Sequence, residues 1–361
     1  MEIFLWWFIC VKNYTSVFLF NFNKFNVSVW MTRFLYKYMK LRPDFFSNPM
    51  IRATPAKHLN DPFEGCFNKE QVRDAHLNHQ NYFGLLGKDV YEDSVDYAVK
   101  NSMGEIESDI NELGVISLTE SYNNTLMWAH YGDEHKGVVV EFDFSVPFFS
   151  SSIHDIDGRS MRFKKDFMAT CFEMPEKVDY RRMFPDFKRP EFANPDEPIE
   201  FHWNKFYQTI LFTKSIDWIY EQEQRSIVRL HDADVMICKD NEFIRSACMD
   251  DADIVLEKYD EENIKIIFPD EYEMREEMGD HSIKMEVFRR INDADAMFFF
   301  RINPLAISSV YFGCKANFNK SILNILNNTS LKQLDNVHIM VPGENLYQFL
   351  PRRISFRRTV K

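Results

Sequence analysis

The stretch SLTESYNNTLMWAHYGDEHKGVVVEF, residues 117–142, decides the fold class of this 361-residue chain. Residues 115–119 alternate towards a buried strand, and the β-branched run VVVEFDF at 138–144 indicates a second strand. Between them, residues 125–131 fit a short helix that polar residues 121–124 would cap. The stretch therefore predicts strand, capped helix, turn and strand in succession.

The rest of the chain mixes strands and helices without a regular strand–helix–strand rhythm. We therefore expect a single α+β domain at residues 31–361, with helices around a mixed or antiparallel sheet. In one version of this prediction the sheet is split. Further strands are expected at 34–39, 50–53, within 217–229, at 308–314 and, as the last one, at 336–341. Helices are expected at 71–110, 200–213 and 320–328. Residues 185–200 are expected to form an irregular loop, and the acidic residues 249–282 to be partly helical.

Composition limits the class of protein. Apolar residues make up 45% and charged residues 27% of the chain, with 35 Phe and only 11 Gly, which favours an aromatic-rich core over glycine-rich phosphate loops. The formal net charge of −12 opposes broad nucleic-acid binding. The basic tail at 352–361 is expected to be a solvated terminus.

The cysteines and the N-terminal segment both indicate the cellular compartment of the protein. The six cysteines are widely spaced and form no Cys-x-x-Cys pair, which predicts reduced thiols in the cytoplasm. The early apolar run is too short to span a bilayer and lacks the features of a signal peptide, so no membrane is expected. Because MTRFLYKY at Met31 resembles a natural start, residues 1–30 are predicted to be a poorly specified extension or an over-extended start.

The segment YEQEQRSIV, which begins at Tyr220, is the strongest candidate for chemistry. In a strand, alternation places Glu221, Glu223 and Arg225 on one face. Two adjacent carboxylates repel, so one pKa should rise unless a cation lies nearby. Such a carboxylate suits general acid–base work or the stabilisation of a cationic transition state. In the alternative interpretation, Arg225 neutralises both carboxylates in a structural ion network.

Metal and nucleotide motifs are sparse. His130 and His135 are five residues apart, so on a helix their side chains would diverge by roughly 140°. A second pair, His76 and His79, lies in a polar segment. Neither pair has a third candidate ligand nearby in the sequence. We therefore predict no metal site. The Rossmann, P-loop and α/β-hydrolase fingerprints are missing from the sequence, which removes the main support for those folds. No prosthetic group is expected.

The block HLNDPFEG is rich in turn-forming residues and favours a structural role. Asn60 and Asp61 are expected to hold a loop through side-chain-to-backbone hydrogen bonds, and Glu64 to pair with an arginine. Trp128 and Tyr131 are expected to pack in the interior, each with one polar tip.

Five blocks in order resemble the bacterial domain of unknown function 2971 family: LYKY, HLNDPFEG, ISLTE…LMWAHYGDEHKGVVVEFD, KSIDWIYEQEQRSIV and VYFGCKA. The resemblance extends over about residues 34–316. It implies a bacterial cytosolic protein without a settled activity, and it suggests a role in anti-phage defence.

A second resemblance is to ADP-ribosyltransferases, which bind NAD in a split α+β sheet. They use a basic or His residue on an early strand, a Ser–Thr or aromatic element in the middle and a Glu on a later strand. Here Tyr36-Lys37-Tyr38, Ser117-Leu118-Thr119 and Tyr220-Glu221-Gln222-Glu223 follow in that order, with Lys37 in place of the usual Arg or His. The resemblance implies that NAD is a substrate rather than a prosthetic group.

The ADP-ribosyltransferase resemblance implies a role for each candidate residue. Glu223 would be the catalytic carboxylate that stabilises the cation left when nicotinamide departs, and Glu221 would orient or deprotonate the acceptor, protein or nucleic acid. The implied substrate-binding residues are Tyr36, Lys37, Arg52, Ser117, Thr119, His130, Tyr131 and Arg225. The alternative is a non-enzymatic sensor or interaction module in which the same polar cluster is a buried scaffold.

Overall fold

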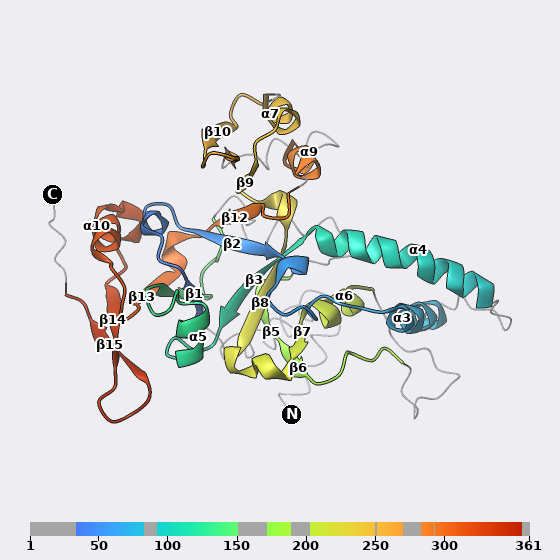
Figure 1. Ribbon diagram of the computed structural model, residues 1–361, viewed down its shortest axis with the longest axis horizontal. Helices are drawn as coiled ribbons and strands as arrows, with labels where there is room; N and C mark the ends of the chain where they lie inside the picture. The colour runs from blue at the N-terminus through green and yellow to red at the C-terminus, as the bar shows by residue number, and fades with distance from the viewer. Residues whose placement is uncertain are drawn as a thin grey trace, which may run out of the picture.

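The computed structural model describes residues 34–82, 92–150, 172–188, 203–249, 251–269, 283–291 and 293–355. The expected N-terminal extension lies outside these ranges. Within them the fold is α+β, as predicted, with a large mixed sheet and a separate pair of short strands (Figure 1).

The described ranges contain fifteen strands, and thirteen of them form one large sheet. The strands are β1 (Phe34–Met39), β2 (Met50–Pro55), β3 (Leu113–Thr119), β4 (Val138–Asp143), β5 (Phe172–Lys177), β6 (Asp179–Arg181), β7 (Thr213–Ser215), β8 (Glu223–Arg229), β9 (Val235–Lys239), β10 (Val255–Lys258), β11 (Asn263–Ile267), β12 (Met297–Arg301), β13 (Ile307–Phe312), β14 (Asn336–Pro342) and β15 (Phe349–Arg353). Their order is β10-β11-β9-β12-β2-β3-β1-β4-β13-β14-β15, while β8 joins β3, β5 joins β8, and β6 pairs with β7 separately.

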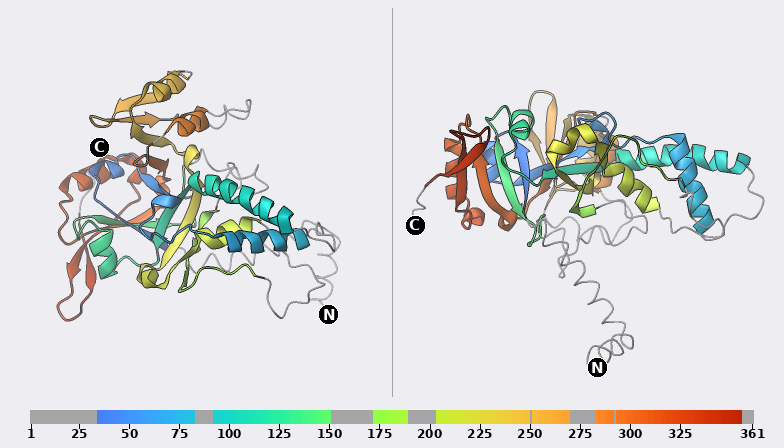
Figure 2. Two further views of the ribbon diagram at one scale, coloured as in Figure 1. Left: turned by 45° about the vertical axis from the view of Figure 1, so that its right-hand side comes forward. Right: turned by 90° about the horizontal axis from the view of Figure 1, so that it is seen from below.

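Helices flank the sheet at several points. They are α3 (Lys69–Tyr82), α4 (Glu92–Asn111), α5 (Thr125–His130), α6 (Trp203–Leu211), α7 (Glu242–Met249), α9 (Ile283–Arg290) and α10 (Asn319–Asn327), with short 3-10 turns that include η6 (Ile216–Glu221). Helices α3 and α4 extend from one side of the sheet, opposite the end that carries α10 and β14–β15 (Figures 1 and 2). Among the described helices, none combines the length and the apolar character needed to cross a membrane.

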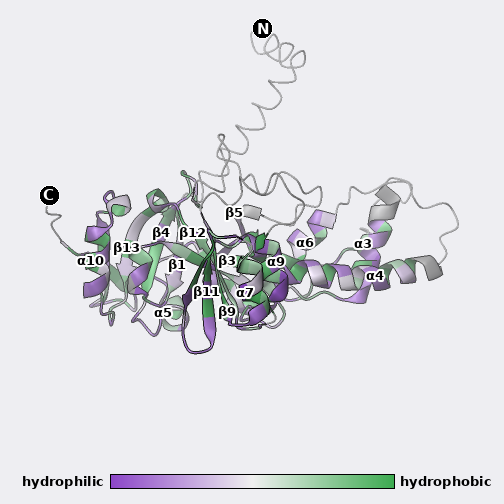
Figure 3. Cartoon of the chain, turned by 90° about the horizontal axis from the view of Figure 1, so that it is seen from above, coloured by the Kyte–Doolittle hydropathy of each residue, from purple (hydrophilic) through white to green (hydrophobic). Residues whose placement is uncertain are grey.

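Phenylalanine dominates the main core, as the composition predicts. Phe46, Phe142, Phe300 and Phe312 are fully buried and belong to one cluster that follows the inner face of the sheet. Figure 3 shows hydrophobic residues along the central strands and hydrophilic ones along α3. Burial of this apolar surface is the main force that holds the strands together.

The opening stretch folds as predicted, into β3, α5 and β4. Asn124 caps α5: its Oδ1 accepts hydrogen bonds from the backbone N–H groups of Leu126 at 3.0 Å and Met127 at 3.2 Å. Trp128 is buried, and its Nε1 donates to the Tyr122 carbonyl oxygen at 2.9 Å. The ring thus packs in the interior while its one polar atom bonds the backbone.

The structure bears on three expectations about the second half of the chain. Within 249–282, the described residues 251–269 form the hairpin β10–β11, because Ile264 and Ile266 alternate into the core while Asp260 bonds the backbone of the turn. Met249 ends α7, and residues 270–282 lie outside the described ranges, so the expectation of a partly helical segment stays a prediction. The basic tail begins in a strand, since Arg352 and Arg353 lie in β15, which pairs with β14, and both side chains are exposed. Strand β14 is therefore not the last strand.

Four cysteines lie in the described ranges. Cys66, Cys238, Cys248 and Cys314 are free thiols. Two of them, Cys238 and Cys248, are buried in the main core.

Candidate functional site

The large sheet is split beside the middle of β3. On one edge, β3 pairs with β8 along its whole length. On the other edge, β2 pairs with one end, Thr54 opposite Val115, and β1 pairs with the other end, Tyr36 opposite Thr119. Strands β1 and β2 therefore diverge at Ser117, and the gap between them exposes the β3 backbone. This split was one version of the predicted fold.

A cavity of about 250 Å³ opens at this gap. Lys37 reaches across the gap from β1, and its Nζ donates a hydrogen bond to the Ser117 carbonyl oxygen at 2.7 Å. The cavity is lined by Tyr36, Lys37, Tyr38, Thr54, His58, Leu59, Asn60, Ser117, Leu118, Thr119, Met127, Tyr131, Lys214, Glu221 and Glu223.

Five charged side chains form a buried ion cluster at the cavity wall: Glu64, Lys214, Glu221, Glu223 and Arg225. Each is at most 6% exposed. Lys214 Nζ lies 2.6 Å from Glu221 Oε2, and 3.1 Å from both Glu223 Oε2 and Glu64 Oε1. Arg225 pairs with Glu223 and with Glu64. Three carboxylates thus meet two cations away from water.

The cations decide which carboxyl group of the cluster stays ionised. Burial by itself would raise the pKa of Glu223, but Arg225 and Lys214 lower that pKa to about 2. Burial raises the pKa of Glu64, and the lowering by Arg225 does not offset it. Glu223 is therefore a permanent anion at neutral pH, suited to stabilising positive charge rather than to carrying a proton.

Lys37 lies in a different environment from Lys214. Burial lowers the pKa of Lys37 to about 8, helped by the charges of Arg52 and Lys214 and opposed by those of Glu223 and Glu221. Because Lys37 remains mostly cationic just below this pKa, it can bind an anion near neutral pH.

Glu221 reaches the cluster from a 3-10 turn and not, as the sequence interpretation expected, from a strand. It is the last residue of η6 rather than part of β8, so the expected strand begins only at Glu223. Gln222 adopts a left-handed conformation, φ 46°, which turns the chain between the two glutamates. Thr119 Oγ donates to the Glu221 carbonyl oxygen at 2.6 Å and fixes this turn against β3.

The segment after β2 contacts the ion cluster through Tyr131. The Tyr131 hydroxyl donates to Glu221 Oε1 and accepts a hydrogen bond from Asn60 Nδ2. Asn60 therefore bonds a side chain and not, as expected, the loop backbone. Asp61 bonds the backbone as predicted, accepting from the Phe63 N–H at 3.0 Å.

The structure brings together most of the residues selected from the sequence. Tyr36, Lys37, Ser117, Thr119, Tyr131, Glu221 and Glu223 all line the cavity. Arg225 lies behind Glu223, and its Nη1 donates a hydrogen bond to the Leu211 carbonyl oxygen at 2.7 Å. Arg52 and His130 are exposed and lie outside the lining; the His130 ring is 6.3 Å from those of Tyr131 and Tyr220.

Sequence reasoning missed Lys214 as a member of the cluster. Lys214 opens the same block, KSIDWIYEQEQRSIV, that contains Glu221 and Glu223. Two buried glutamates need a cation, and the nearest lysine in the block was a usable signal. Within the described ranges, no group of three or more His, Cys, Asp or Glu side chains is placed to hold a metal ion.

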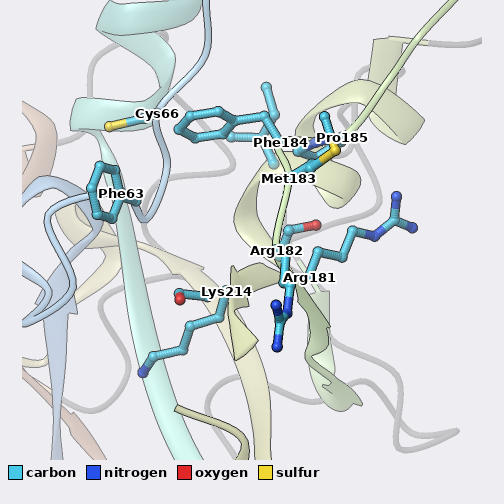
Figure 4. Close-up of a pocket in the computed structure, with 11 residues that line it drawn as sticks. Phe63, Cys66, Arg181, Arg182, Met183, Phe184, Pro185 and Lys214 are labelled. Atoms are coloured by element: carbon cyan, nitrogen blue, oxygen red, sulfur yellow. The ribbon is translucent and has the colours of Figure 1, made fainter. Parts of the chain in front are cut away.

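A smaller cavity of about 170 Å³ lies next to the cluster and shares Lys214 with it. Figure 4 shows Phe63 on one side of this cavity and Arg181 and Arg182 on the other. Arg181 is already paired with Asp179 at 2.5 Å.

Comparison with protein families adds one finding. A model described as "Protein of unknown function (DUF2971)" matches residues 127–226. The match is narrower than the resemblance expected over about 34–316. The DUF2971 segment runs from α5 to β8 and contains four of the five members of the cluster, all except Glu64. Comparisons with curated proteins and with solved structures give no match.

Proposed function

We propose that the chain is an NAD-using, ADP-ribosyltransferase-like enzyme that works in the cavity beside Ser117. The observation that carries this proposal is the adjacency of β1, β3 and β8 in the sheet. Lys37, Ser117 and Glu223, one residue from each strand, line the same cavity. This matches the order of basic, Ser–Thr and Glu elements that the resemblance to ADP-ribosyltransferases implies.

The reaction breaks the bond between the nicotinamide nitrogen and C1′ of the ribose. The bonding electron pair leaves with nicotinamide, and the ribose becomes an oxocarbenium-like cation. Glu223 supports this step because Arg225 and Lys214 keep it ionised within a site of low dielectric, where a fixed negative charge stabilises a developing cation strongly. No rearrangement of the carboxylate is needed as the charge develops.

The acceptor completes the transfer. Its lone pair forms the new bond to C1′, and its proton passes to a base. We assign this task to Glu221, which lines the cavity and whose carboxylate is oriented by the Tyr131 hydroxyl and by Lys214 at 2.6 Å. Lys37 carries a positive charge that binds the phosphate on the nicotinamide side of NAD.

The test is incubation of the purified chain with labelled NAD and cell lysate. Wild-type protein is expected to release nicotinamide and to transfer label. Glu223→Gln is expected to lower both on the order of 10²-fold, because it removes the charge but keeps the shape. Glu344→Gln, at an exposed site, is the matched control and is expected to behave as wild type. Failure of the wild-type protein to release nicotinamide or transfer label would defeat the proposal.

A specific observation favours a second candidate, a non-enzymatic sensor or interaction module. Each carboxylate oxygen of Glu223 already accepts a hydrogen bond from Arg225, and Lys214 adds another, as in a structural scaffold. If the wild-type protein binds NAD but releases no nicotinamide, this second candidate is favoured. The anti-phage role implied by the family resemblance stays a prediction, and plaque counts with wild type and Glu223→Gln test it.

A further inference from the structure

A second and larger hollow lies on the part of the sheet formed by β2, β12, β9 and β11. We call it the β12 groove, and its volume is about 560 Å³. Its floor is the apolar cluster of Val235, Ile237 and Phe299, and Arg42 and Tyr259 lie at its sides. The proposed activity assigns nothing to this groove.

The β12 groove and the Ser117 cavity open on the same face of the sheet. Directly paired residues of neighbouring strands point to one face. Phe299 pairs with both Val235 of β9 and Arg52 of β2. Alternation along β2 places Thr54 on the same face as Arg52, and Thr54 pairs with Val115 of β3. The face is therefore continuous from the floor of the groove to the cavity.

Strand β2 runs from one site to the other. Met50 lines the groove, Thr54 lines the cavity, and Arg52 stands between them on the same face. Four residues of a strand cover about 13 Å. The cavity is smaller than the roughly 300–1,000 Å³ typical of a site that holds a whole drug-sized ligand. A dinucleotide seated in it must therefore extend beyond it.

The side chains of the groove fit a flat, phosphate-bearing group. The Arg42 guanidinium lies 5.1 Å from the centre of the Phe299 ring, and Tyr259 is 51% exposed. Aromatic rings and guanidinium planes are the surfaces on which nucleobases stack.

The charges beside the groove also favour an anion. Arg42 and Arg52 are exposed at the surface, but partial desolvation lowers the pKa of each, and the Arg52 charge contributes to the lowering at Arg42. Asp295 partly offsets the charge of Arg52, and Asp44, which also lines the groove, partly offsets that of Arg42. Two of the acidic groups have lysine partners: Glu257 lies 2.8 Å from Lys265 and Asp44 lies 3.9 Å from Lys320. A phosphate between the two arginines would relieve their repulsion.

We propose that the β12 groove binds the adenosine end of NAD, with its base beside Arg42 and Tyr259 and its pyrophosphate at Arg52. This inference rests on the proposed function, because it supplies a site for the half of the substrate that the cavity does not hold. The nicotinamide end then lies in the cavity beside Glu223.

Calorimetric titration with each half of the substrate tests the inference. AMP is expected to bind the wild-type protein, and Arg42→Ala and Tyr259→Ala are each expected to weaken that binding about tenfold. Neither variant should change the binding of nicotinamide mononucleotide. Arg289→Ala is the matched control for the arginine, since α9 packs on the opposite face through Phe288 and Phe298. Tyr97→Ala, exposed on α4, is the control for the tyrosine.

The outcomes separate this inference from the activity. AMP that fails to bind, or binds all variants equally, overturns the groove assignment even if the wild-type protein releases nicotinamide from NAD. AMP binding that is lost in both groove variants, together with no release of nicotinamide, supports the groove and defeats the proposed reaction. Because Arg42 also packs on Phe299, the thermal midpoint of each variant is measured first, and the exposed Tyr259 provides the second, independent reading.

Discussion

Arg225 and Glu223, two residues apart on β8, share two parallel hydrogen bonds, Nε to Oε1 at 2.7 Å and Nη2 to Oε2 at 2.9 Å. This bidentate geometry is the strongest form of carboxylate recognition by a side chain. Both groups are almost completely removed from water, so each depends on the other to offset its desolvation. The pair therefore holds the cluster together and fixes the charge that faces the cavity.

Removing the guanidinium should be costly for the fold. Arg225→Met keeps most of the side-chain volume but removes one of the two cations that Glu223 and Glu64 share, leaving them with Lys214 alone. We expect the free energy of unfolding in urea to fall by about 3–5 kcal/mol, since two buried carboxylates each lose a partner. Arg245→Met is the matched control, because Arg245 pairs with Asp240 at the surface, and its urea midpoint should not move. Equal midpoints for both variants would contradict the structural role of Arg225.

Acid should destabilise the protein through Glu223. Its pKa falls from an ordinary 4.5 to about 2 on folding, so its contribution is complete above pH 4.5 and is lost as the pH drops towards 2. The contribution is about 3 kcal/mol. Glu64, whose pKa is raised, contributes a slope of the opposite sign, so the difference between wild type and Glu223→Gln is what must be measured. Parallel stability curves for the two proteins between pH 4.5 and 2 would refute this prediction.

The fold around α5 could be predicted because its signals are local. Asn124 precedes the helix and caps it, and the runs on either side alternate or are β-branched, which identifies β3 and β4 without knowledge of the rest of the chain. The same-face placement of Glu223 and Arg225 followed from strand alternation alone.

The cavity itself could not be predicted in this way. It depends on Tyr36 and Thr54 pairing with opposite ends of β3, and alternation indicates which face a residue occupies but not which strands are neighbours. Glu64 meets Arg225 across 161 residues of sequence. The turn at Gln222, which brings Glu221 back to the cluster, left no pattern because it breaks the alternation on which the prediction relied.

A close approach of two loops explains the glycine in VYFGCKA. A Cβ atom on Gly313 would lie 2.1 Å from the His135 carbonyl oxygen, a backbone atom that must then shift. We expect Gly313→Ala to lower the free energy of unfolding by about 1–3 kcal/mol. Gly104→Ala is the control: Gly104 lies in α4 with open space around its Cβ position, and the change should stabilise the helix by about 0.5–1 kcal/mol. If Gly313→Ala leaves the midpoint of thermal unfolding unchanged, the backbone at His135 shifts at little cost in free energy, which contradicts this prediction.

Binding of the substrate should depend on pH through Lys37. Burial lowers the pKa of this lysine to about 8, so its ammonium is charged below that pH and neutral above it. An anion bound beside it favours the charged form, and binding must weaken as the pH rises through 8. We expect the affinity for nicotinamide mononucleotide to fall about tenfold between pH 7 and 9.5, the value of one charge-assisted hydrogen bond.

The Lys37→Met variant isolates this effect. It keeps the aliphatic stem in the gap between β1 and β2 but cannot titrate, so its affinity should already be low at pH 7 and should not change with pH in this range. Lys332→Met, at an exposed position, is the matched control and should keep the wild-type slope. If Lys37→Met shows the same slope as the wild-type protein, the titrating group is another one, and Lys37 does not bind the phosphate. A wild-type affinity that rises with pH contradicts the assignment equally, because loss of the ammonium charge can only weaken the binding of an anion.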